Sequence, residues 1–224
     1  MRRVVFVVFV LFLFAGAVFA QPAIEWQTSL GGSGDDGYDY WYWGQVSIQQ
    51  TSDGGFIVAG TSRSNDGDVS GWHEGYDEYG DPLPDYWVVK LNSAGDIVWQ
   101  KSLGGSGVDG ARSIQQTSDG GFIVAGYSHS DDGDVSGNHG GADYWVVKLN
   151  SAGDIEWQKC LGGSYRDEAY SIQQTSDGGY IVAGYSESNN GDVSGNHGAD
   201  YWVVKLNSAG SIEWQKSLGG GGVD

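Results

Sequence analysis

The sequence predicts an all-β protein made of β-propeller-type blades, each with four antiparallel strands. A nearly verbatim internal repeat and a set of short strand-like segments inside each repeat support this fold class. Four tryptophans at equivalent positions mark the repeat, namely Trp26, Trp99, Trp157 and Trp214. The first interval between them is long, and the two later intervals are nearly equal. Because self-similarity at a fixed period is the signature of repeat architectures, the repeat decides the fold before any single element does.

The first interval is longer than the others because the first repeat carries two insertions. The stretch from Ser33 to Ser47 is twice as long as the matching stretch of each later repeat. The stretch from Gly67 to Tyr86 is also longer than its counterpart in the second repeat. Together with the tryptophan spacing, this predicts three complete repeats over residues 33–103, 104–161 and 162–218.

The second repeat illustrates the four expected strands. Residues 113–117 lead through a Ser-Asp-Gly-Gly turn into residues 122–127, and residues 144–149 lead through Asn-Ser-Ala-Gly into residues 155–159. Asp-Gly and Gly-Gly pairs supply the positive φ angles that tight hairpins need. In the fourth segment Ile155 and Trp157 share one face and Glu156 the other, as in a half-buried strand.

Four short antiparallel strands repeated around an axis are typical of a β-propeller, with a β-solenoid as the rival. The segment 24–27 repeats the fourth-strand sequence ahead of the first complete repeat, so it is a spare N-terminal strand. Three blades are too few to close a ring, which predicts an incomplete one. We expect the intact protein to continue into further repeats, with an open arc closed by another copy as the alternative.

Residues 1–20 predict a secretory signal peptide ahead of a repeat domain over residues 21–224. Arg2 and Arg3 precede an apolar run from Val4 to Phe14, and Val18 and Ala20 stand where a cleavage site needs small or modest residues. The alternative is an uncleaved membrane anchor, for which this run is short. Later segments are too polar to span a membrane, so the sequence predicts a secreted or cell-surface protein.

Charge and cysteine content narrow the function further. Without Arg2 and Arg3 the chain keeps nine basic residues against 29 acidic ones. This surplus repels phosphate backbones, so nucleic acid is excluded as an expected partner. A single cysteine, Cys160, allows no internal disulfide.

At the level of the repeat, the chain resembles secreted and surface-anchored repeat proteins of bacteria and archaea. The stretch carrying this resemblance is QTSDGGYIVAGYS followed by GDVSGNHGADYWVVKLNSAGSIEWQKSLGG. The fragment WVVKLNSAGDIEWQK also resembles the strand-turn-strand unit of quinoprotein-type propellers. The turn Thr51-x-Asp53-x-Gly55, found in all three repeats, resembles the Asp-box of sialidase propellers, although Val58 replaces the aromatic residue that closes that box. The resemblance implies a propeller-like architecture and no activity.

Aromatic residues in the two insertions of the first repeat are the candidate ligand site. In a four-stranded blade both insertions fall on the same face, and insertions gathered on one face of a repeat protein mark a binding surface. Aromatic rings suit sugar rings or protein partners. The alternative is that they plug the arc or cover a neighbouring blade. The candidate ligand-binding residues are Tyr40, Trp41, Trp43, Trp72, His73 and Tyr76.

Repeated acidic loops between the second and third strands are the candidate metal sites. Closely spaced oxygen ligands around glycine suit calcium, which is the one cofactor we consider. The alternative is that these side chains cap turns by bonding to their own backbone. The candidate calcium ligands are Asp66, Asp68, Asp131, Asp132, Asp134, Asp143, Asp192 and Asp200.

No catalytic motif accompanies these features. The sequence lacks a Gly-x-Ser-x-Gly elbow, a phosphate loop and a nucleotide fingerprint. Acidic residues repeated in every unit indicate a structural role, since an active site is normally built once. We therefore expect a non-catalytic extracellular domain for glycan or protein binding and adhesion. The alternatives are a fragment of a catalytic propeller, glycosidase-like or quinoprotein-like, and a purely structural surface module.

Overall fold

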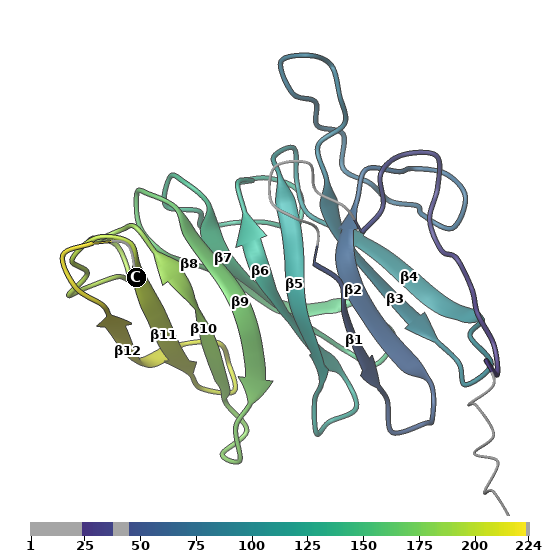
Figure 1. Ribbon diagram of the computed structural model, residues 1–224. Helices are drawn as coiled ribbons and strands as arrows, with labels where there is room; N and C mark the ends of the chain where they lie inside the picture. Colours follow the sequence, from purple (N-terminus) through teal and green to yellow (C-terminus); the bar gives the residue numbers. More distant parts are fainter. Residues whose placement is uncertain (1–23, 38–44, 223–224) are drawn as a thin grey trace, which may run out of the picture.

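The computed structural model describes residues 24–37 and 45–222, which fold into twelve β-strands in three separate sheets (Figure 1). The first blade contains β1 (Ser47–Gln50), β2 (Phe56–Ser62), β3 (Asp85–Leu91) and β4 (Ile97–Leu103). The second blade contains β5 (Asp109–Gln116), β6 (Phe122–Ser128), β7 (Asp143–Leu149) and β8 (Ile155–Leu161). The third blade contains β9 (Asp167–Gln174), β10 (Tyr180–Ser186), β11 (Asp200–Leu206) and β12 (Ile212–Leu218).

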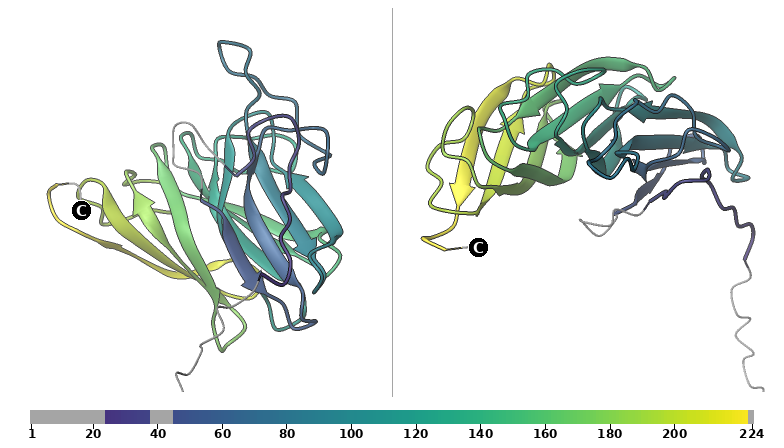
Figure 2. Two further views of the ribbon diagram at one scale, coloured as in Figure 1. Left: turned by 45° about the vertical axis from the view of Figure 1, so that its right-hand side comes forward. Right: turned by 90° about the horizontal axis from the view of Figure 1, so that it is seen from above.

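Within each blade the four strands pair with their neighbours in chain order, and every pairing is antiparallel. Seen from above, the three sheets follow one another along an open arc (Figure 2). No helix occurs in the described part of the chain. The expectation of an all-β fold with four-stranded antiparallel blades is therefore confirmed.

The turn between the first and second strands has the same construction in each blade. In the first blade the Asp53 carboxylate accepts hydrogen bonds from Thr51 Oγ1 and from the Gly55 amide. Gly54 has a φ of 82°, a left-handed conformation that favours glycine. The buried Lys90 reaches the same carboxylate from β3, with Nζ 2.9 Å from Asp53 Oδ2. The Asp-box-like motif thus ties the turn to the third strand of its own blade.

The blades are held together by aromatic side chains between successive sheets. Tyr86 on β3 packs against Trp145 on β7 with ring centroids 4.5 Å apart, and its hydroxyl donates to the Trp145 carbonyl. Tyr144 repeats both contacts with Trp202 on β11, at 4.7 Å. All four side chains are fully buried. Two nearly identical interfaces therefore lie within one chain.

The predicted spare strand at 24–27 is not a strand in the structure. It belongs to none of the three sheets, and no strand of the described residues pairs with it. It is instead anchored by Trp26, whose ring meets Phe56 edge-on at 5.6 Å. Trp99 on β4 packs on Phe122 of the following blade in the same manner, at 5.7 Å. Trp26 thus occupies the place that the fourth-strand tryptophan of a preceding blade would take.

Two further expectations concern export and the lone cysteine. The predicted signal peptide lies outside the described residues. Among the residues that are described, no helix is long and apolar enough to cross a membrane. Cys160 is a free, buried thiol, and burial raises its pKa above the usual range.

Candidate binding surface on the first blade

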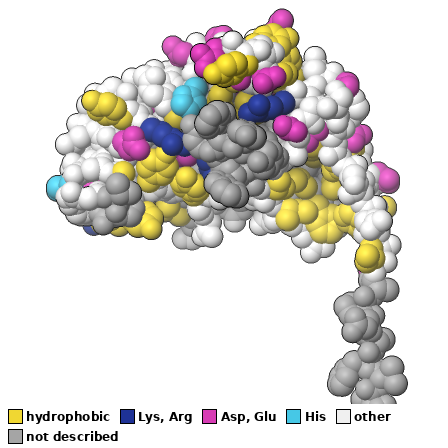
Figure 3. Space-filling model, turned by 45° about the horizontal axis from the view of Figure 1, so that its top comes forward, with side chains coloured by type: hydrophobic (Ala, Val, Ile, Leu, Met, Phe, Trp, Pro, Cys, Tyr) yellow, Lys and Arg dark blue, Asp and Glu magenta, His cyan; other side chains and the backbone are white. Residues whose placement is uncertain are grey.

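A cleft of about 490 Å³ lies between the inserted hairpin that joins β2 and β3 and the chain leading into β1. Ser33, Gly34 and Asp35 come from the chain leading into β1, and the hairpin between β2 and β3 faces them. Figure 3 shows apolar and acidic side chains side by side on the projecting hairpin, with basic side chains next to it. The complete lining is Ser33, Gly34, Asp35, Arg63, Asp77, Tyr79, Asp81 and Pro82.

The hairpin between β2 and β3 projects beyond the other loops (Figure 1). Its turn is closed by hydrogen bonds from the Asp77 amide to the Asp81 carbonyl and from the Gly80 amide to the Asp77 carbonyl. Asp77 Oδ1 also accepts from the amides of Tyr79 and Asp81, at 2.8 and 2.9 Å. The bond from the Asp81 amide holds the pKa of the Asp77 carboxyl below its usual range. Tyr79 at the tip is 80% exposed.

Of the six predicted ligand-binding residues, three are described and they have different roles. Trp72 braces the hairpin, since its Nε1 donates to the Leu83 carbonyl at 2.7 Å and its ring meets Tyr76 edge-on. Tyr76 is exposed. His73 binds Asp85 through its Nδ1, and its part in ligand binding stays a prediction. Tyr40, Trp41 and Trp43 lie outside the described residues.

His73 belongs to a series of three equivalent histidines. Its backbone amide and its Nδ1 both bond to Asp85 Oδ2, at 2.8 and 2.9 Å. Its Nε2 lies 3.6 Å from Asp134 Oδ2 in the loop of the second blade. His139 and His197 bind Asp143 and Asp200 through the same two nitrogen atoms. Because His73 falls within an insertion, sequence comparison did not align it with the other two.

The eight predicted calcium ligands each accept a hydrogen bond from the protein. Asp66 Oδ1 and Asp132 Oδ1 accept from the amides of Ser33 and Ser106, both at 2.7 Å. Asp143 and Asp200 bind the histidines. The remaining four accept from amides, namely Asp68 from Gly31, Asp131 from Gly137, Asp134 from Gly104 and Asp192 from Gly162. In the described chain no three histidine, cysteine or acidic side chains are placed to hold a metal ion. Asp131, Asp143 and Asp200 accept from amides of their own loop, as the turn-capping alternative expects, whereas the other five bind amides of the segment that precedes the first strand of their own blade. Calcium binding stays a prediction.

The third repeat offers a natural control for the capping role of Asp132. Asn190 takes the equivalent position and accepts from the Ser164 amide at 3.0 Å. We expect Asp132→Ala to lower the free energy of unfolding by about 1 kcal/mol, because the Ser106 amide loses its acceptor. Asp132→Asn is expected to be nearly neutral. Thermal melts with calcium and with a chelator should give the same loss, and a loss seen solely with calcium would make the loop a metal site.

The sequence did not predict pairs of buried aspartates at the junctions between blades, although Asp143, a member of one pair, was a predicted calcium ligand. Asp85 on β3 and Asp109 on β5 are both completely buried, and each has an Oδ1 atom without a hydrogen-bond partner. Both carboxyls lie close to Gly104. A Cβ atom built on this residue would lie 2.5 Å from Asp109 Oδ2 and 2.7 Å from Asp85 Oδ1, so a side chain there would clash with both, and glycine leaves the space they need. The second and third blades repeat this arrangement with Asp143, Asp167 and Gly162.

Burial shifts the titration of these carboxyls upward. It raises the pKa of Asp109 to about 7, and the nearby Asp85 charge raises it further, against the hydrogen bonds from Ser128, Gly105 and Ser130. Burial likewise raises the pKa of Asp85 to about 6, although the bonds from His73 oppose the rise. The sequence did contain a signal for the buried aspartates at the start of the second and third blades. An aspartate follows the second glycine of each Leu-Gly-Gly by four positions, and this regularity was not used as a prediction.

A charged cluster at the junction of the second and third blades was also missed. Glu168 on β9 is completely buried and pairs with Arg112 of β5, whose Nη2 lies 3.2 Å from Glu168 Oε2, and with Arg166. Arg112 lies over the rings of Tyr127 and Tyr170. The signal was a departure from the repeat, since Gly110 stands where the third repeat has Glu168. With both of its oxygens bound by arginines, this carboxylate has a structural role.

Comparison with known proteins identifies a partial relative. No family model matches the sequence. The chain is similar to the regulatory protein FlaEY of Caulobacter vibrioides, with 30% identity over 161 residues. The match covers 65% of this chain and 15% of that protein, so the chain spans a small part of its relative.

Proposed function

We propose that this chain is an exported, non-catalytic repeat domain that binds neutral carbohydrate outside the cell or at its surface. The observation that carries the proposal is the cleft on the first blade, where the inserted hairpin between β2 and β3 meets the chain leading into β1. The repeats that lack these insertions differ from the first at this face. A feature built once, on a scaffold whose other loops are nearly identical, is where a specific ligand would be bound.

The chemistry of the cleft suits a sugar. Tyr79 offers a flat apolar ring with a polar edge, and such rings pack against the faces of sugar rings. Arg63, Asp77 and Asp81 line the same cleft and supply polar groups to orient hydroxyls. The formal charge of −18 disfavours acidic polymers, so among carbohydrates we favour a neutral one.

The environment of Asp77 agrees better with a binding role than with glycoside hydrolysis. Hydrolysis by paired carboxyls needs one group with a raised pKa to act as the acid. The Asp77 carboxyl instead has a lowered pKa and bonds to two amides of its own turn. Its position is explained by the need to shape the hairpin.

Export is supported by the leader-like residues 1–20. Surface adhesion would follow if the bound carbohydrate belongs to a cell wall or a neighbouring cell. Retention of the chain in the cytoplasm, measured by fractionating a host that expresses the full sequence, would contradict this part of the proposal.

Native affinity gels containing neutral polysaccharides such as xylan, mannan or β-glucan test the binding proposal. We expect at least one polymer to retard the chain, and Tyr79→Ala to weaken that retardation about tenfold, because the ring supplies the main apolar contact. Tyr165→Ala is the matched control, since Tyr165 is 63% exposed and does not line the cleft. Equal retardation of both variants, or no retardation by any polymer, would reject carbohydrate binding at this cleft.

A further inference from the structure

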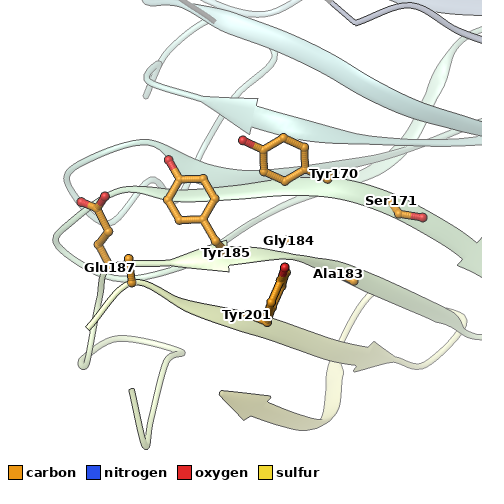
Figure 4. Close-up of a pocket in the computed structure, with 8 residues that line it drawn as sticks. Tyr170, Ser171, Ala183, Gly184, Tyr185, Glu187 and Tyr201 are labelled. Atoms are coloured by element: carbon orange, nitrogen blue, oxygen red, sulfur yellow. The ribbon is translucent and has the colours of Figure 1, made fainter. Parts of the chain in front are cut away.

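The third blade leaves one face of its sheet uncovered. A groove of about 550 Å³ lies there, lined by side chains of β9, β10 and β11. Figure 4 shows the rings of Tyr170, Tyr185 and Tyr201 on these three neighbouring strands, pointing to the same side. Tyr201 is 61% exposed, whereas its counterparts Tyr86 and Tyr144 in the other blades are completely buried.

The internal junctions show what this groove receives elsewhere in the same chain. At both junctions the tyrosine hydroxyl donates to a tryptophan carbonyl of the following blade, at 2.9 Å. The tryptophans that meet Tyr86 and Tyr144 are Trp145 and Trp202. The residue equivalent to them in the first blade is Trp87 on β3. The first blade therefore carries the matching half of the interface that the third blade lacks.

The first blade exposes an apolar side chain on the side where a preceding blade would lie. Ile48 on β1 is 62% exposed, while its counterparts Ile114 and Ile172 are 5% and 3% exposed against a preceding blade. Isoleucine at this repeat position is buried in the second and third blades and exposed in the first, which indicates that the first blade lacks the contact with a preceding blade.

We propose that the open face of the third blade docks the first blade of a second copy of this chain, head to tail. In this complex Tyr201 packs against Trp87 of the second copy in the way that Tyr86 packs against Trp145 within one chain. The same contact buries Ile48 of the second copy. A second copy is the occupant that the structure favours because both complementary surfaces lie on this chain and match two interfaces it already forms. Two copies supply six blades, within the range of four to eight that propellers use.

The N-terminal segment 24–30 regulates this docking. Its Ile-Glu-Trp-Gln sequence recurs at the start of β12, where Trp214 is 46% exposed. Docking would bring Trp214 to the Phe56 ring of the second copy, which Trp26 already covers. The strand β12 is paired with β11 along its length, whereas the segment 24–30 is paired with no described strand. We therefore expect docking to displace Trp26 from Phe56 and to leave Trp214 on β12 in its place.

Sedimentation equilibrium of the chain beginning at residue 21 tests the proposal. We expect a concentration-dependent rise in mass from one copy to two, and no rise for either Tyr201→Lys or Ile48→Lys. Tyr165→Lys, which places the same charge on an exposed tyrosine outside both faces, should associate normally. Circular dichroism should show folded chains for all three variants, since these side chains are exposed in the single copy.

Mixing the two defective variants gives the decisive result. A head-to-tail interface joins different surfaces, so the intact Tyr201 face of the Ile48→Lys chain can still meet the intact Ile48 face of the Tyr201→Lys chain. We expect the equimolar mixture to form a dimer that neither variant forms alone. Trp26→Ala should tighten self-association of the parent chain about tenfold, because the competing ring is removed. A single-copy mass for both the parent chain and Trp26→Ala at about 100 µM would overturn the proposal, as would failure of the mixture to associate.

Discussion

Replacing Tyr144 with alanine is expected to lower the free energy of unfolding by about 4 kcal/mol. The side chain is completely buried between the second and third blades. Its ring packs on Trp202 at 4.7 Å, and its hydroxyl donates to the Trp202 carbonyl. Removal therefore leaves a cavity at the centre of a blade interface and a buried carbonyl without this donor. Urea denaturation followed by tryptophan fluorescence measures the loss.

Tyr201 provides the matched control within the same protein. It occupies the same position in its repeat but faces the open groove, so Tyr201→Ala should change the free energy of unfolding by less than about 1 kcal/mol. The comparison should be made at low protein concentration, where self-association does not contribute. Equal losses for the two variants would mean that the tyrosine stabilises its own blade and that the interface contributes little.

Asp109→Asn is expected to stabilise the protein above neutral pH. Burial raises the pKa of Asp109 to about 7 in the folded chain, against an ordinary value of 3.8. The folded state therefore binds the proton more tightly than the unfolded state, and stability falls as the pH rises from about 4 to about 7. A pKa difference of about three corresponds to a loss on the order of 4 kcal/mol. Asparagine carries no charge to bury, so the variant avoids this loss.

The asparagine also keeps the contacts that position the side chain. Its Oδ1 can accept from the Gly105 amide and Ser130 Oγ, as Asp109 Oδ2 does. Its Nδ2 takes the position of Asp109 Oδ1, an atom that has no hydrogen-bond partner to lose. Melting temperatures from pH 4 to pH 8 should converge for the two proteins at the acid end and separate at the alkaline end. A constant difference across this range would show that Asp109 does not titrate in it.

Asp119→Asn serves as the control of opposite sign. Burial favours a higher pKa for Asp119, but the bonds from Thr117, Gly121 and Lys148 outweigh it and lower the pKa to about 2. A carboxyl with a depressed pKa stabilises the fold above its unfolded pKa and loses that contribution as the pH falls toward about 2. Asp119→Asn should therefore destabilise the protein by a similar amount at every pH from 5 to 8.

Much of the blade could be predicted from local sequence, and the errors have identifiable causes. The second strand of the second repeat, expected over residues 122–127, is β6 (Phe122–Ser128). The first strand, expected from residue 113, begins at Asp109 instead. Its early residues pair with β6 across a bulge between Ala111 and Ser113. The run Asp-Gly-Ala-Arg has low strand propensity, and pairing with a neighbouring strand overrides it.

The predicted site residues were recovered less completely. The sequence placed Trp72 and Tyr76 in an insertion but could not predict whether each ring packs against its own loop or faces solvent. That depends on contacts such as the hydrogen bond from Trp72 to the Leu83 carbonyl. Tyr79, an aromatic residue of the same insertion outside the six named candidates, is the exposed ring of the cleft. Its signal was its place two positions after an aspartate and one before a glycine, a turn tip that holds a side chain outward.

The sequence by itself determined the repeat, the four-stranded blade and the turns, because periodicity and turn chemistry are local properties of the chain. The tertiary structure alone decided which surfaces remain open and which carboxyls are buried in pairs. Identical residues such as Tyr86, Tyr144 and Tyr201 have different environments, since burial depends on whether another blade lies against them. Asp85 and Asp109 become neighbours in the same way, because successive blades bring residues of two different sheets to either side of one glycine.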